Sequence, residues 1–105
     1  MTFGRWQPLA QAAGHASARP GIFQVRQTKG LIEYPRGKSA MLYYECTDDL
    51  TVAIAAYAAR HPDADWLCRH TVEMTEHEAA NLSQTFDRLI GQFESRFGKR
   101  PAPPA

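Results

Sequence analysis

One amphipathic segment near the C-terminus constrains the fold of this sequence most strongly. From Ala79 to Phe97 large apolar residues recur every three or four positions, the spacing of one helix face. Thr75 and Glu78 stand at the positions of a capping box, and Gly98 and Pro101 predict the end of the helix. We interpret the phenylalanine stripe as core rather than as a docking surface. A helix with such a stripe needs an apolar layer to cover.

Three segments predict the strands of that layer. Residues 21–26 and 40–46 are rich in β-branched and aromatic residues, and the second of these is apolar on both faces over most of its length. Residues 66–74 alternate between the two faces. Gly30–Lys38 predicts a long hairpin loop with a short extension around Leu31–Tyr34.

Leu50–Arg60 predicts another helix, the first of the two predicted helices along the chain, which follows candidate capping residues and is ended by His61-Pro62. The resulting order is β-β-α-β-α. A hairpin followed by a helical crossover places the first strand in the centre. We therefore expect an α+β fold, a two-layer sandwich with a three-stranded antiparallel sheet in the order 2-1-3.

The length and composition fit one domain. We expect an irregular N-terminal arm at residues 1–19 with one helical turn near Leu9–Ala13, a domain at 20–101, and a loose proline-rich tail at 102–105. No apolar run approaches the roughly 20 residues of a membrane span. The N-terminus lacks the pattern of a signal peptide, and two cysteines are too few for a disulfide scaffold. These features predict a cytoplasmic protein that is not bound to a membrane.

Several short segments recur along the predicted domain in an order and spacing that can be compared with known families. They are Gly21-Ile22-Phe23, Leu42-Tyr43-Tyr44-Glu45-Cys46-Thr47-Asp48-Asp49-Leu50, Leu89-Ile90, Phe93, Phe97-Gly98 and Pro101. In this order and spacing the chain resembles the GIY-YIG nucleases over roughly residues 20–101. The resemblance implies a groove in which two tyrosines, an arginine and a metal-binding glutamate cut a phosphodiester.

The resemblance also implies that most of this machinery is lost. The five matching positions hold Phe23, Tyr43, Glu45, Ala53 and Phe86, of which only Tyr43 keeps the type of the family residue. The arginine falls at Ala53 and the metal-binding glutamate at Phe86. Loss of one preorganised electrostatic donor typically costs about 100- to 1000-fold in rate. We therefore expect no catalytic residues, no metal and no cofactor, and a catalytically degenerate domain that acts as a binding module.

An alternative is an active, divergent metal-dependent DNA endonuclease with displaced residues. It would use Tyr43, Arg60, Asp87 and His61 with Mg²⁺ or Mn²⁺. A zinc site formed by Cys46, Cys68, His70 and His77 is disfavoured, because two strand spacings separate the cysteines in the predicted sheet. A nucleophilic pair of Cys46 and a histidine is disfavoured too, since nothing local orients it.

Charge is unevenly distributed although the net charge is only +1. Residues 19–38 hold five basic residues against one acidic, residues 45–78 eight acidic against two basic, and residues 87–100 four basic against two acidic. Candidate nucleic-acid contacts are Arg26, Lys29, Arg36, Lys38, Arg96, Lys99 and Arg100. A protein partner at the acidic segment of the first helix, or at an open sheet edge, remains an alternative, and the sequence leaves the oligomeric state open.

Overall fold

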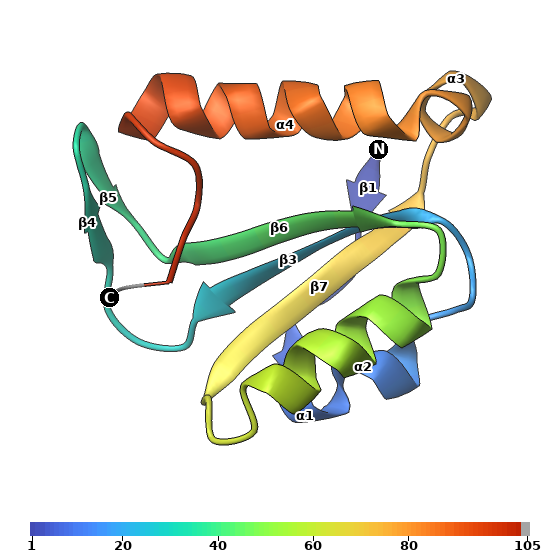
Figure 1. The fold of residues 1–105 in the computed structure, drawn as a ribbon, viewed down its shortest axis with the longest axis horizontal. Coiled ribbons are helices and arrows are strands. Elements are labelled where there is room, and N and C mark those ends of the chain that lie inside the picture. Colours follow the sequence, from blue (N-terminus) through green and yellow to red (C-terminus); the bar gives the residue numbers. More distant parts are fainter. Residues whose placement is uncertain (104–105) are drawn as a thin grey trace.

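Three long antiparallel strands form the centre of the protein in the computed structural model, which describes residues 1–103 (Figure 1). They are β3 (Gly21–Gln27), β6 (Met41–Thr47) and β7 (Trp66–Glu73). β3 lies between the other two and pairs antiparallel with both. The expected α+β class is confirmed, and these three strands lie in the relative order expected for them.

The sheet has five strands rather than the expected three, because the N-terminal arm pairs with β7. β1 (Thr2–Phe3) and β2 (Gln7–Pro8) both run antiparallel to the outer edge of that strand. Strands of two residues are too short to show any periodicity in the sequence. The arm is therefore only partly irregular, since it completes the sheet and continues into α1 (Leu9–Ala12) and a 3₁₀ turn at Ala13–His15.

The main core lies between the sheet and helices α1 and α2 (Leu50–Arg60). Asp49 caps α2 by accepting a hydrogen bond from the amide of Val52 at 3.1 Å. One face of the sheet is covered by the apolar side chains of both helices. The buried cluster comprises Leu9, Ala12, Phe23, Val25, Leu42, Leu50, Ile54, Tyr57 and Cys68.

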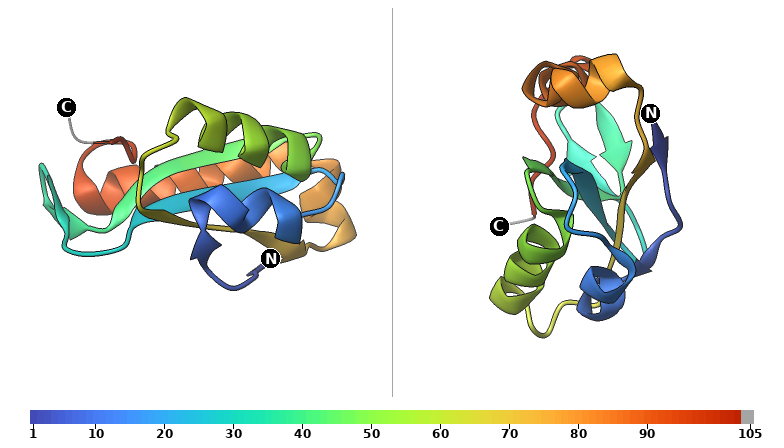
Figure 2. Two further views of the ribbon diagram at one scale, coloured as in Figure 1. Left: turned by 90° about the horizontal axis from the view of Figure 1, so that it is seen from below. Right: turned by 90° about the vertical axis from the view of Figure 1, so that its right-hand side faces the viewer.

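The opposite face of the sheet is covered by α4 (Leu82–Phe97), so the expected two-layer arrangement is wrong. Figure 2 shows α1 and α2 on one side of the strands and α4 on the other. Tyr44 of β6 meets Phe93 of α4 with ring centroids 5.8 Å apart. A strand that is apolar on both faces needs cover on both, and residues 40–46 of β6 have that composition.

The C-terminal helical segment is broken rather than continuous. The capping box forms as expected between Thr75 and Glu78 and starts α3 (Glu76–Ala80). Asn81 then leaves the helical conformation, and its side-chain amide donates to the carbonyl of His77 at 2.9 Å. The second helix ends as expected at Gly98, whose φ of 91° is left-handed.

A small hairpin of β4 (Ile32–Tyr34) and β5 (Gly37–Ser39) packs against the end of α4. Tyr34 anchors it, because its ring centroid lies 5.1 Å from that of Phe93 and its hydroxyl donates to the carbonyl of Met41 at 2.5 Å. The amide of Ala102 lies 3.3 Å from the same hydroxyl. The start of the tail that we expected to be loose is thus tied to the hairpin, while residues 104–105 lie outside the described residues.

Candidate functional site

The residues at the matched family positions do not line one common groove. Phe23 is fully buried beneath α2, and Ala53 packs on the same core from the helix side. Tyr43 and Glu45 lie on the same face of β6 as their partners in β3, because Glu45 is paired with Phe23. Phe86 belongs to α4, which covers the other face of the sheet (Figure 1).

The one retained tyrosine lies in an aromatic cluster. The ring of Tyr43 stacks on Tyr57 at 4.4 Å between centroids, with an interplanar angle of 19°. Its hydroxyl donates to Oε1 of Glu45 at 2.5 Å. Burial, together with the hydrogen bond and the charge of Glu45, raises the pKa of Tyr43 to about 12, and the Arg60 charge opposes the shift. Tyr43 therefore holds its proton firmly at neutral pH.

Three of the four displaced residues of the endonuclease alternative gather around this cluster. The guanidinium carbon of Arg60 lies 5.3 Å from the Tyr57 ring centroid, and the His61 ring lies 4.6 Å from it. Asp87 is exposed on α4, away from this cluster. Its charge is one of the smaller causes that raise the pKa of Cys46 on β6, after burial. The structure thus brings Tyr43, Arg60 and His61 together and leaves Asp87 apart.

Tyr57 lies at the centre of this cluster, a place that was not predicted from the sequence. Tyr57 is 2 % exposed, and its hydroxyl has no hydrogen-bond partner among residues 1–103. A helical spacing of three and four residues separates it from Arg60 and His61, and this spacing is the only signal that could have linked them.

The cysteines and histidines considered for zinc are separated in the structure. Cys46 is paired with Ile22, whereas Cys68 is paired with Val25 on the other face and is fully buried. Burial raises the pKa of the Cys68 thiol to about 12. Within residues 1–103 no group of three or more histidine, cysteine, aspartate or glutamate side chains could hold a metal ion.

Four of the seven expected nucleic-acid contacts lie at one end of the molecule, where the hairpin meets the end of α4. We name this group the basic end; it comprises Arg36, Lys38, Arg96 and Lys99. Arg36 donates to the carbonyls of Glu94 and Ser95 at 3.1 and 2.9 Å. Gly37 lies beside Arg96, and Nζ of Lys99 lies 5.5 Å from the Tyr34 ring centroid.

The other three residues that we expect to contact nucleic acid lie outside the basic end. Lys29 and Arg100 are exposed in the segments that lead into the hairpin and out of α4. Arg26 projects from β3, and its guanidinium carbon lies 4.5 Å from the Trp6 ring centroid. The guanidinium carbon of Arg69 lies at the same distance from that centroid, although Arg69 was not among the expected nucleic-acid contacts. Nothing in the sequence indicates that the arm brings Trp6 over these two strands.

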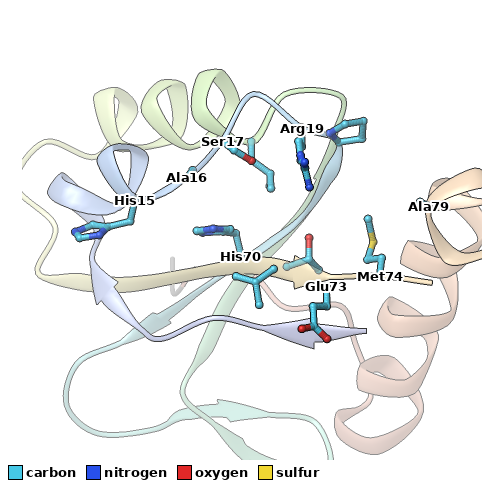
Figure 3. Close-up of a pocket in the computed structure, with 12 residues that line it drawn as sticks. His15, Ala16, Ser17, Arg19, His70, Glu73, Met74 and Ala79 are labelled. Atoms are coloured by element: carbon cyan, nitrogen blue, oxygen red, sulfur yellow. The ribbon is translucent and has the colours of Figure 1, made fainter. Parts of the chain in front are cut away.

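A cavity of about 570 Å³, lined by both polar and apolar side chains, opens at the opposite end of the sheet from the hairpin. Figure 3 shows His15 and Arg19 of the arm on one side of it and His70 and Glu73 of β7 on the other. Burial, and then the charge of His15, lowers the pKa of His70. The cavity was not predicted, because its walls come from a pairing of the arm with the sheet that the sequence does not reveal.

No protein-family model, no curated protein and no solved structure matches the chain. The resemblance to the GIY-YIG nucleases therefore stays a prediction from the residues quoted above. Within residues 1–103 no helix combines the length and the apolar character needed to cross a bilayer. A cytoplasmic location likewise stays a prediction.

Proposed function

We propose that this chain is a catalytically degenerate GIY-YIG-like domain that acts as a nucleic-acid-binding module through its basic end. The observation that carries the proposal is the convergence of Arg36, Lys38, Arg96 and Lys99 from two segments more than 50 residues apart in the chain. Three features support the degenerate state. Phe23 lacks a hydroxyl and is buried, Ala53 replaces the expected arginine, and Phe86 replaces the expected glutamate.

The charges of the basic end are suited to a phosphate backbone. Lys38 and Glu33 form one ion pair of 3.8 Å, but both side chains are mostly exposed, so the pair contributes little and is easily replaced. Arg36 is held by the last carbonyls of α4, which fixes the position of the hairpin. Cations arranged in this way give sequence-independent affinity that falls as salt rises.

The test is binding of fluorescently labelled DNA and RNA, followed by anisotropy at several salt concentrations. Lys38→Gln and Lys99→Gln remove exposed cations without breaking the Arg36 bonds. Each should weaken binding uniformly across sequences and reduce the salt slope by about 1. Arg19→Gln is the matched control, because Arg19 lines the cavity at the other end of the molecule. Arg19→Gln should leave the slope unchanged.

Absence of binding at low salt would remove the nucleic-acid proposal and favour a protein partner. β6 would then be the first surface to examine, because it pairs only with β3 among residues 1–103 and leaves an open edge. The acidic residues expected on the first helix instead flank it, since α2 itself contains none.

A second candidate is a divergent metal-dependent DNA endonuclease. The observation that favours it is the carboxylate of Glu45 on the hydroxyl of Tyr43, with the Arg60 charge close by. A phenol, a carboxylate and a guanidinium are the groups that such chemistry requires. Incubation of plasmid DNA with Mg²⁺ or Mn²⁺ tests it. Nicking that Tyr43→Phe abolishes and Glu33→Gln preserves would support this function, and absence of nicking would exclude it.

A further inference from the structure

Two arginines of the sheet face that carries α4 pack against one tryptophan. Arg26 of β3 and Arg69 of β7 share this face, because Gln24 is paired with Arg69 and lies two residues before Arg26. Each guanidinium carbon lies 4.5 Å from the Trp6 ring centroid, so the two carbons are at most twice that distance apart. The chain thus holds two like charges beside one aromatic ring.

Neither guanidinium forms a salt bridge within the part of the chain that the structure describes. Nε of Arg69 donates to Oε1 of Gln24 at 2.7 Å, and Gln24 is 2 % exposed, which fixes the orientation of this guanidinium. Nε of Arg26 is buried without any partner among the described residues.

This arrangement lowers the stability of the folded protein unless an acceptor binds the unpaired N–H group. The Trp6 ring stabilises cations through its π face but accepts none of the in-plane N–H donors. A buried N–H without an acceptor costs about 1–3 kcal/mol, and a neighbouring like charge adds to the cost. An acceptor that approaches this donor therefore removes the cost.

We propose that Arg26 and Arg69 form a binding site for a phosphate-type oxyanion, with Trp6 as its cover. Guanidinium groups bind tetrahedral oxyanions through paired, charge-assisted N–H···O bonds, and two of them supply a set of donors that one lysine cannot. Arg69 is positioned in advance by Gln24. The buried donor of Arg26 gains an acceptor when the anion binds.

This site is distinct from the basic end and does not depend on the proposed function. Arg26 lies on the central strand, whereas the basic end lies where the hairpin meets α4. The phosphoryl group could be free inorganic phosphate or a phosphodiester of a nucleic acid, since both present the same oxygens. A protein that fails to bind nucleic acid can still bind phosphate here.

The test is a titration of the full ¹⁵N-labelled chain, followed by the indole N–H signal of Trp6 and the Nε–H signals of Arg26 and Arg69. Inorganic phosphate is one titrant, a short single-stranded DNA oligonucleotide is the other, and chloride at matched ionic strength is the reference. Arg69→Gln should weaken binding about tenfold or more. Arg26→Lys, which keeps the charge and loses the planar fork, is the second variant and should weaken binding too.

Arg5→Gln is the matched control, because Arg5 is exposed beside Trp6 in the same arm; it should bind nearly as the unmodified chain does. Saturable shifts with inorganic phosphate support a free-phosphate site. Shifts with the oligonucleotide alone, lost in Arg69→Gln, support a phosphodiester site. Shifts no larger than those in chloride, or shifts that both variants retain, would overturn the proposal.

Discussion

The buried hydroxyl of Tyr57 gives the sharpest test of how the side chains pack around β6. This residue is 2 % exposed, its hydroxyl has no partner among residues 1–103, and burial is the main cause that raises its pKa to about 12. Burial of a hydroxyl without a hydrogen bond costs about 1–3 kcal/mol. Tyr57→Phe removes the hydroxyl and keeps the ring that stacks on Tyr43.

Tyr57→Phe should therefore increase the free energy of unfolding by about 1 kcal/mol. For a domain of this size that corresponds to a rise in Tm of about 4–8 °C. In urea the midpoint should rise by about 0.3–1 M, since m for small proteins is about 1–3 kcal/mol/M. Circular dichroism during thermal and urea unfolding measures both quantities.

Tyr34→Phe is the matched control with the opposite expected sign. The Tyr34 hydroxyl donates a hydrogen bond to the carbonyl of Met41 and accepts one from the amide of Ala102. The same substitution therefore removes both hydrogen bonds. It should lower the free energy of unfolding by about 1–2 kcal/mol. A destabilised Tyr57→Phe variant would refute the reasoning, because the hydroxyl must then make a stabilising bond in solution.

Three further outcomes follow from local structure. Gly98→Ala should destabilise the protein by about 1 kcal/mol or more, because φ is 91° and a Cβ there would lie 2.8 Å from Cβ of Pro35; urea unfolding measures the loss. Thr75→Ala should cost about 1 kcal/mol in the same assay, since the capping box with Glu78 is lost. Partial burial, and then the charge of His15, lowers the pKa of His70, so the unfolded chain takes up its proton first as pH falls below about 6.5. The wild type should accordingly lose stability between pH 7 and pH 5, and His70→Gln should lose less, as Tm measured across this range would show; equal losses would contradict the assignment.

Much of the architecture follows from patterns that reach over ten or more residues. Leu50–Arg60 is helical over the bounds that its spacing and its proline stop predict. Residues 66–73 form a strand, as their alternation indicates. The capping box at Thr75 and the stop at Gly98 also form as predicted, because these features depend on bonds within one or two turns of helix.

The sequence patterns predicted much less about the candidate sites than about the strands and helices. Tyr43 and Arg60 meet through the packing of α2 on the sheet, whereas the sequence alone supports only the hypothesis that they share a groove. Arg26 and Arg36 were grouped by their proximity in the chain, yet one lies under Trp6 and the other binds the end of α4. Charge alone does not say which strand or helix will hold a side chain.

The amino-acid order by itself determined the class of the fold, the long strands, α2, the start of α3 and the end of α4. Those features depend on periodic burial and on local hydrogen bonds, and residues close together in the chain are enough to predict both. Tertiary structure alone decided that the arm adds two strands to β7, that α4 covers the second face of the sheet, and that Trp6 lies over Arg26 and Arg69. These arrangements depend on which sheet edge and which sheet face are still uncovered when the remaining segments pack. Contacts between residues so far apart in the chain produce no periodic pattern in the sequence.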